Sequence, residues 1–214
     1  PAVKPFRARF KSTSESNVFA KHPRGASRWT QSRETLHSDN KPEMPKVNLV
    51  ERFTEELLAL NGQVVICKEA DLPGKIIAML RERNVDRVQT WDQILGLDEA
   101  AITKAGISVQ NEADENIKAG ITGALAGIAE TGTLVIPGGE GRPLTASLLP
   151  EIHIAVLRKS DIHENLPKAL TLRKVEKYAS IVLVSGPSRT ADIEMTLTIG
   201  VHGPGELFVF LVRK

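Results

Sequence analysis

Short apolar segments alternate with helical patterns from residue 47 onward, and this alternation limits the possible folds more than any other feature. An apolar stripe at helical spacing covers residues 47–60, Asn61 and Gly62 end it, and residues 64–66 are a short apolar strand. The pattern continues with helices over residues 72–83 and 98–105 and strands over 86–91 and 107–109. Short apolar strands between helices are typical of a sheet buried on both faces. We therefore expect an α/β domain with a largely parallel sheet and helices on both faces.

The second half of this domain predicts antiparallel strands as well. Residues 121–128 and 133–136 flank Glu130, Thr131 and Gly132, a pattern that indicates two strands joined by a tight turn. Residues 152–157 and 181–184 are strongly apolar strands, and a helix that begins near Ser160 or Asp161 and runs through Leu172 would join them in a βαβ unit. Residues 207–212 predict a last strand, and residues 193–199 alternate as a strand does.

Residues 1–46 have a different composition and predict an extended, poorly ordered arm ahead of a single domain over residues 47–214. Apolar residues are scattered there at no fixed period, among many Ser, Lys, Arg and Pro residues. The segment contains ten Lys or Arg residues but only four Asp or Glu, although the whole chain has a net charge of only +2. Few aromatic residues accompany these charges and no recognition motif is present, so we favour a solvated arm over a nucleic-acid interface.

The composition excludes several classes of protein. Hydrophobic residues make up 41% of the chain and charged residues 25%, as in ordinary soluble domains. No apolar stretch is long enough to span a membrane, and the N-terminus lacks the apolar segment of a signal peptide, so we expect a cytoplasmic protein. The lone Cys67 cannot form a disulfide or an iron–sulfur site within this chain, and its place at the end of an apolar strand predicts a buried structural thiol.

The strongest candidate for a ligand site follows the expected strand over residues 181–184. Gly186 would let the backbone approach a ligand, the hydroxyl groups of Ser188 and Thr190 would donate hydrogen bonds, and Arg189 could grip a carboxylate or phosphate with its forked guanidinium. The alternative is that Arg189 pairs with Asp192 or Glu194 and the hydroxyl groups satisfy the turn. The spacing alone leaves both interpretations open.

Two further segments are weaker candidates. Glu130, in the turn between the two expected antiparallel strands, could act as an acid, base or nucleophile if it were partly buried, but a turn residue in solvent is the favoured interpretation. The glycine-rich residues 137–143 lack the Gly-Lys-Ser/Thr ending of a phosphate loop, and no clear helix follows immediately, so a flexible surface loop is expected.

The histidines occur singly, without the spacing of a metal motif, and no metal site is predicted. His202 is the most suggestive of them, because it precedes the last strand within a segment of Gly and Pro. His153 lies inside an apolar strand and is expected to be a hydrogen-bonded core residue.

Four motifs that occur in order after residue 120 resemble a known family. They read GIAETGTLV (127–135), LPEIHIAV (149–156), GPSRTADIE (186–194) and GVHGP (200–204). From residue 47 to the C-terminus the chain is similar to lactate utilization protein C, the LutC/YkgG family of LUD-domain proteins. The resemblance implies an α/β fold like that of sugar isomerases and CoA transferases (NagB/RpiA-like). It also implies a part in oxidising L-lactate to pyruvate together with two iron–sulfur partner proteins, which would carry the clusters that this chain lacks.

The resemblance marks one candidate site that combines these segments. It would bind a small carboxylate or a phosphorylated ligand near a residue able to accept the proton of the lactate hydroxyl. The candidate catalytic residues are Glu130, His202 and Asp192, and the candidate ligand-binding residues are Thr131, Gly186, Ser188, Arg189, Thr190 and Glu194. Two other functions stay open: a non-catalytic assembly or regulatory protein, and an independent enzyme that acts on a sugar phosphate or an acyl-CoA.

Overall fold

The computed structural model describes residues 48–213 apart from residues 115, 174, 192–196 and 200–202. The expected boundary between arm and domain, at residues 46 and 47, therefore lies outside the described residues. Among the helices of the described part, none is long and apolar enough to cross a membrane.

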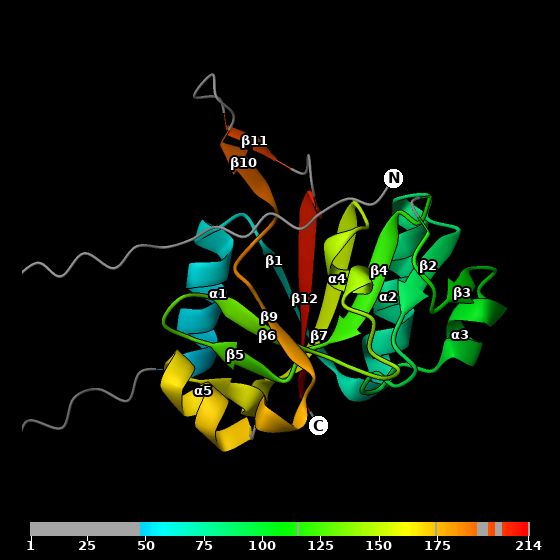
Figure 1. The fold of residues 1–214 in the computed structure, drawn as a ribbon. Helices are drawn as coiled ribbons and strands as arrows, with labels where there is room; N and C mark the ends of the chain where they lie inside the picture. The colour runs from blue at the N-terminus through cyan, green and yellow to red at the C-terminus, as the bar shows by residue number, and fades with distance from the viewer. Residues whose placement is uncertain (1–47, 115, 174, 192–196, 200–202, 214) are drawn as a thin grey trace, which may run out of the picture. The chain divides into compact units, whose positions relative to one another are not determined.

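Six parallel strands form the main sheet, in the order β1-β12-β7-β4-β2-β3 (Figure 1). The strands are β1 (Gln63–Lys68), β2 (Arg87–Thr90), β3 (Ser108–Gln110), β4 (Ala119–Gly123), β7 (Ile152–Arg158) and β12 (Glu206–Arg213). The central strands β7 and β12 are buried along nearly their whole length, which requires apolar residues on both faces. The expected α/β domain with a largely parallel sheet is confirmed.

Four strands form a second sheet, in the order β8-β5-β6-β9. They are β5 (Ala126–Ile128), β6 (Thr133–Gly138), β8 (Ile162–His163) and β9 (Ser180–Val184). Strands β5 and β6 pair antiparallel across the turn at residues 129–132, as the sequence predicts, and β6 pairs antiparallel with β9. A separate antiparallel pair is formed by β10 (Arg189–Ala191) and β11 (Leu197–Ile199).

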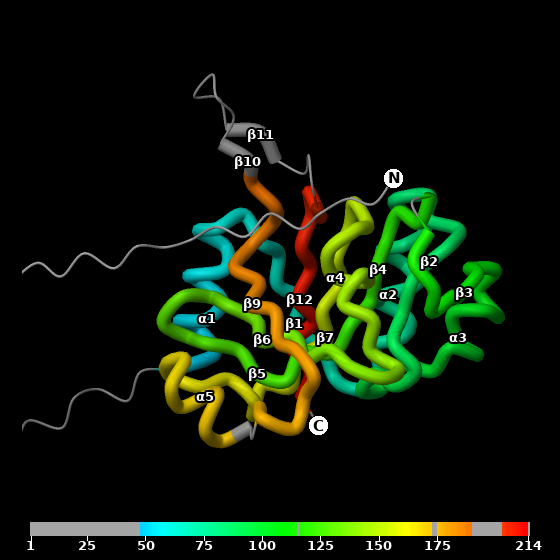
Figure 2. Tube along the Cα trace, viewed as in Figure 1, coloured from blue at the N-terminus to red at the C-terminus, as the bar shows by residue number. Residues whose placement is uncertain are grey.

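Two expectations about strand pairing are wrong. The apolar stretch 121–128 is not one strand, because the chain leaves the main sheet after β4 and enters the second sheet at β5 (Figure 2). Strands β7 and β9 do not form a βαβ unit, because they belong to different sheets. Both errors have the same cause: local apolar pattern identifies a strand but not its partner.

The helix between β7 and β9 also begins later than predicted. Residues 159–163 form the 3-10 turn η2 (Lys159–Asp161) and β8, and helix α5 (Leu166–Arg173) begins after them. The side chain of Asn165 caps this helix, accepting a hydrogen bond from the Lys168 backbone N–H at 3.1 Å. Pro167 can stand only in the first turn of a helix, so a start at residue 160 or 161 would place it in the interior.

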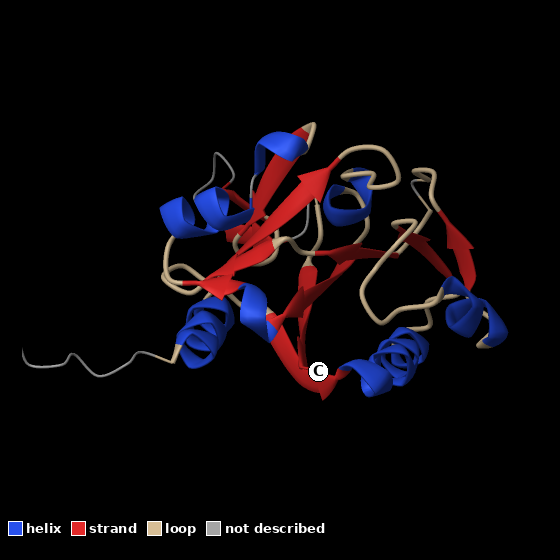
Figure 3. Cartoon of the chain, turned by 90° about the horizontal axis from the view of Figure 1, so that it is seen from below, coloured by secondary structure: helices blue, strands red, loops and turns tan. Residues whose placement is uncertain are grey.

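The remaining helices cover the two faces of the main sheet (Figure 3). They are α1 (Leu49–Ala59), α2 (Leu72–Glu82), α3 (Glu99–Lys104) and α4 (Thr145–Leu148), with the short 3-10 turns η1 (Glu69–Asp71) and η3 (Val175–Lys177). Helix α2 lies over the face that carries Val65, Phe208 and Phe210. Helix α4 packs against β4 and β7, and α1 packs against β1 and β8.

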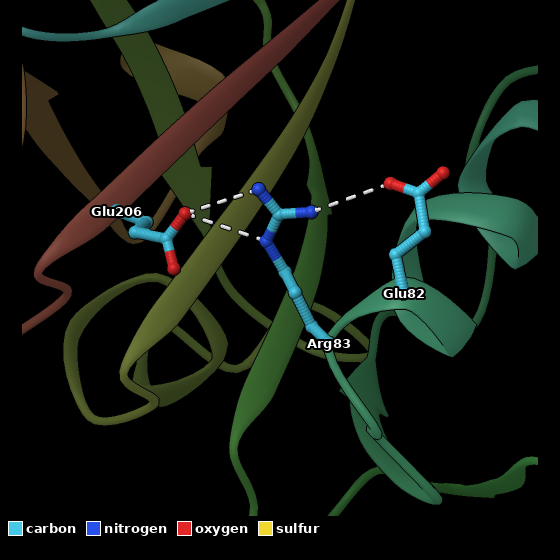
Figure 4. Close-up of polar contacts among 3 residues, drawn as sticks. All are labelled: Glu82, Arg83 and Glu206. Carbon is cyan, nitrogen blue, oxygen red and sulfur yellow. Dashed lines mark hydrogen bonds and ion pairs between the residues drawn. The ribbon is translucent and has the colours of Figure 1, made fainter.

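An arginine at the end of α2 joins this helix to the start of β12 (Figure 4). The Nε and Nη2 atoms of Arg83 donate hydrogen bonds to Oε2 of Glu206 at 3.3 and 3.2 Å, and the guanidinium carbon lies 4.4 Å from the centre of the Phe208 ring. Glu82 lies on the other side of the guanidinium at 4.0 Å. Elements more than 120 residues apart are thus held together by an ion pair and a cation–π contact.

The glycine-rich segment 137–143 reaches the surface at Gly139 and Glu140, as expected of a surface loop, but part of it is regular secondary structure. Its first two residues complete β6, and Gly139 and Arg142 exchange backbone hydrogen bonds at 3.4 and 3.0 Å across a closed turn. The backbone N–H of Asp92 donates to the carbonyl oxygen of Gly141 at 3.1 Å and anchors this turn to the end of β2. Helix α4 follows two residues later, where no clear helix was expected.

Helix α4 lies so close to β4 that Gly120 has no room for a side chain. A Cβ atom there would overlap the carbonyl oxygen of Ala146, a backbone atom that cannot rotate away. We predict that Gly120→Ala lowers the free energy of unfolding by about 1–3 kcal/mol, as overpacking does. The measurement is urea unfolding followed by circular dichroism.

Gly74→Ala is the matched control for this prediction. Gly74 lies in α2, where a Cβ would meet no atom within 4 Å, so alanine should leave stability unchanged or raise it by up to about 1 kcal/mol. Equal unfolding midpoints for the two variants would show that α4 does not press against β4 as described.

Candidate functional site

A cavity of about 500 Å³ lies between the main sheet, α4 and β9. Its walls include His153 near the start of β7 and Leu207 near the start of β12, together with residues 182–188 and the loop residues Gly203 and Pro204. We call it the His153 cavity. It therefore brings together residues from three of the motifs that carry the family resemblance, two of which hold candidate site residues.

His153 is fully buried, and only one of its two ring nitrogens has a hydrogen-bond partner among the described residues. Its Nε2 lies 2.9 Å from the hydroxyl oxygen of Thr122 on the neighbouring strand β4, whereas its Nδ1 has no hydrogen-bond partner among the described residues. Burial lowers the pKa of His153 to about 3, because the charged form would lose its hydration, so the imidazole is neutral at neutral pH. The expected buried, hydrogen-bonded histidine is present, and its second ring nitrogen is a buried polar atom without a hydrogen-bond partner among the described residues, in a residue that lines the cavity.

The loop after β9 is shaped by contact with the end of α1. Gly186 has a φ of +90°, and a Cβ there would come within 2.8 Å of the Leu60 carbonyl oxygen, so this position requires glycine. The Ser188 backbone N–H donates to the Pro204 carbonyl oxygen at 2.7 Å, which joins this loop to the segment before β12. Gly186 and Ser188 consequently line the His153 cavity, as two of the predicted ligand-binding residues.

Arg189 makes a contact that neither sequence interpretation named. Its Nη2 donates to the carbonyl oxygen of Leu60 at 2.7 Å, and the side chain is exposed. The guanidinium thus satisfies a carbonyl group at the C-terminal end of α1, where positive charge is favourable. In this structure Arg189 helps to hold the loop on α1.

The turn between β5 and β6 is linked to the same loop by hydroxyl groups. The hydroxyl oxygen of Thr131 lies 2.7 Å from that of Thr133, which lies 2.7 Å from that of Ser185. Gly132 has a φ of +59°, and a Cβ there would overlap the backbone of α1 at Leu57. Both turns are therefore seated on α1, and the fold brings the two sequence motifs together.

The other predicted site residues lie elsewhere. Glu130 is exposed in its turn, as the favoured interpretation of the sequence held, and the burial that a reactive carboxyl would need is absent. Thr190 belongs to β10, where its backbone pairs with Thr198. The candidates Asp192, Glu194 and His202 lie outside the described residues.

Cys67 is 5% exposed, and burial raises the pKa of its thiol, so the expected buried structural thiol is confirmed. Within the described ranges, no group of three or more His, Cys, Asp or Glu side chains is arranged to hold a metal ion.

Sequence reasoning did not place His153 or its partner Thr122 in a site. The available signal was a single imidazole in an otherwise apolar strand, which must find hydrogen-bond partners for both ring nitrogens when it is buried. Whether the second nitrogen would face the core or a cavity depends on α4 and β9, which are distant in sequence.

Comparisons with known proteins agree with this fold. The family model of the LUD domain matches residues 50–212. Lactate utilization protein C of Halalkalibacterium halodurans is 36% identical over 56% of this chain, and the protein YkgG of Escherichia coli K12 is 32% identical over 75%. A DUF162 family protein from Deinococcus radiodurans, solved as a crystal structure, has a TM-score of 0.58 at 22% identity and covers 79% of this chain and 99% of its own.

The alignments cover the relatives to different extents. An uncharacterized protein of Neisseria meningitidis serogroup B is 38% identical over 45% of this chain, but only 43% of its own length is covered. The corresponding shares are 50% for the Halalkalibacterium protein and 72% for YkgG. The chain thus spans about half the length of the Neisseria and Halalkalibacterium proteins.

The buried imidazole predicts a loss of stability in acid. The folded protein keeps His153 neutral down to about pH 3, whereas the unfolded chain binds a proton near pH 6.5. The stability is therefore complete above about pH 6.5 and decreases as the pH falls toward 3. Between pH 7 and pH 5 this group should cost about 2 kcal/mol of unfolding free energy.

His153→Gln isolates this contribution, since glutamine keeps hydrogen-bonding atoms but does not titrate. Urea unfolding at pH 7, 6 and 5 should show a shallower decline for the variant than for the parent protein. The same decline in both would contradict a neutral, buried His153.

Proposed function

The chain belongs to the LUD domain family, and from this premise we propose that it serves in lactate utilization and binds a small 2-hydroxy or 2-oxo carboxylate in the His153 cavity. The names of its relatives from Halalkalibacterium and Macrococcus, lactate utilization protein C, support the process. One structural observation carries the binding site: the buried His153, whose Nδ1 has no hydrogen-bond partner among the described residues, lines a cavity together with the loops at residues 185–188 and 203–204.

The chemistry of the cavity suits a neutral hydrogen-bonding role for His153. If Thr122 donates to Nε2, then Nδ1 carries the proton and can donate to a carboxylate oxygen. If Nε2 donates to Thr122 instead, Nδ1 can accept the hydrogen bond of a substrate hydroxyl. A 2-hydroxy acid offers both groups, so it matches either tautomer. A pKa near 3 makes the imidazole a weak base, which assigns it to orienting the ligand.

No charged side chain is among the described residues that line this cavity. A bound carboxylate would therefore depend on hydroxyl groups, with Ser188 and Ser185 at the loop that follows β9. The candidate His202 immediately precedes the lining residue Gly203 in sequence, and in this proposal it accepts the proton of the substrate hydroxyl.

The oxidation of lactate to pyruvate releases two electrons and two protons, and the electrons need an acceptor. We assign that acceptor to iron–sulfur partner proteins, because the single buried Cys67 cannot supply the several thiolates of a cluster. In this proposal the chain contributes substrate binding to a system whose redox centres lie on other subunits.

One observation favours an assembly role as a second candidate. Leu148, Leu149 and Leu183 line the His153 cavity and are 41%, 59% and 48% exposed, so the cavity has an apolar rim. Exposed apolar groups of this kind are typical of surfaces that contact another protein.

Ligand binding provides the first test of this proposal. L-lactate and pyruvate should raise the thermal unfolding temperature of the full chain, because a ligand that prefers the native state stabilises it. Ser188→Ala and His153→Gln should each weaken the affinity about tenfold or more, as the loss of a hydrogen bond to a charged group does. The matched control Ser108→Ala, at the exposed first position of β3, should leave the affinity unchanged. Unaltered affinity in both Ser188→Ala and His153→Gln would exclude the His153 cavity as the site.

A reconstitution experiment tests the process itself. We expect anaerobic, L-lactate-dependent dye reduction by the chain and two iron–sulfur partners to disappear when the chain is omitted. Ser188→Ala should lower that activity, while Ser108→Ala should not. Full activity without this chain would contradict a catalytic subunit, and activity that needs the chain but ignores Ser188→Ala would favour the assembly role.

A further inference from the structure

A second cavity, of about 580 Å³, lies at the carboxyl edge of the main sheet and shares no lining residue with the His153 cavity. Its walls follow the ends of three strands: Trp91 after β2, residues 123–125 at the end of β4, and Arg158 as the last residue of β7. We call it the carboxyl-edge cavity. Its volume falls within the range of roughly 300–1,000 Å³ of small-molecule sites.

The strand order places this cavity where ligands bind in open α/β sheets. Within the main sheet, the next strand along the chain after β2 is β3, which lies on its outer side. The next strand of this sheet after β4 is β7, which lies on the opposite side. The crevice between the carboxyl ends of β2 and β4 is therefore the point at which the order reverses. Trp91 and Gly123 stand at this crevice, and a Cβ on Gly123 would lie 3.3 Å from the Trp91 ring.

Two guanidinium groups line this cavity, whereas the described residues that line the His153 cavity include no charged side chain. Arg142 is presented by the closed turn at residues 139–142, and its guanidinium carbon lies 5.6 Å from the centre of the Tyr178 ring. Gly141 has a φ of +67° and packs against Asp92, so the turn that carries Arg142 is fixed to the end of β2. Asp161 is the only carboxylate among the described lining residues, which leaves a positive balance.

The remaining walls are apolar and aromatic. Trp91 is 4% exposed, and its Nε1 donates to the Pro143 carbonyl oxygen at 3.2 Å, which fixes the indole ring. Ile94, Leu125 and Pro137 complete this wall, and Tyr178 is half-buried beside Arg142. The cavity therefore offers forked cations next to flat, apolar surfaces.

We propose that the carboxyl-edge cavity binds a nucleotide, with its phosphate groups on Arg142 and Arg158 and its base against the half-buried Tyr178, within reach of Trp91 as a lining residue. Guanidinium forks match phosphate oxygens in geometry, and aromatic rings stack on flat bases. This site goes beyond the proposed carboxylate site and does not depend on it, since the two cavities have separate walls.

The test uses the fluorescence of Trp91 in the full chain, with Trp29→Phe as the background so that one tryptophan reports. ADP, GDP, UDP and CDP are titrated separately, alongside adenosine and inorganic phosphate. At least one nucleotide should change the fluorescence saturably at up to millimolar concentrations and bind more tightly than either adenosine or phosphate. Arg142→Gln and Arg158→Gln should each weaken it about tenfold or more.

Arg81→Gln is the matched control, because it removes the same charge from an exposed position of α2 that does not line the cavity, and should leave nucleotide affinity unchanged. Ser188→Ala should also have no effect, which separates this site from the carboxylate site. The proposal is overturned if no nucleotide binds, if phosphate alone binds as tightly, or if the Arg142 and Arg158 variants bind as well as Arg81→Gln does.

Discussion

Close backbone contact at three glycines determines how the parts of this domain fit together. Gly120 lets α4 touch β4, while Gly132 and Gly186 seat two turns on the C-terminal half of α1. A Cβ at any of them would press on backbone atoms, which cannot move aside as a flexible side chain can. The glycines therefore set how closely α4 approaches β4 and where the turns that contain Gly132 and Gly186 lie against α1. The His153 cavity is the space that these fixed contacts leave between α4, β9 and the main sheet.

Strand β7 contributes to two sites of opposite character. His153 lies near its amino end and lines a cavity without described charged groups, and Arg158 ends it and lines a cavity together with Arg142. Arg158 is five positions after His153, about 16 Å along the strand at strand geometry. Burial keeps His153 neutral, so this residue can contact a ligand through hydrogen bonds but not through a positive charge. The carboxyl edge retains its positive charge and suits an anion, which gives the two sites different ligand preferences.

The loop after β9 shows how far local sequence can identify a site. Its residue types predicted a ligand-binding loop, and Gly186 and Ser188 do line a cavity. The sequence left open whether Arg189 binds a ligand or a neighbouring carboxylate, and in the structure its Nη2 donates to the carbonyl oxygen of Leu60, at the end of α1 where carbonyl groups need partners. Glu130 lies in a turn that the sequence predicted. Gly132 of this turn packs against α1, and Glu130 is exposed.

The sequence by itself determined the class of fold and the positions of most elements, because the spacing of apolar residues is a local property that survives without knowledge of partners. Its ordered motifs also pointed to the LUD domain family, which the family match over residues 50–212 confirms. Only the tertiary structure decided which strands share a sheet, dividing residues 121–128 between two sheets and separating β7 from β9. It also decided that His153 borders one cavity and that Arg142 and Arg158 line another. These outcomes depend on packing between segments far apart in the chain, and no local pattern records that packing.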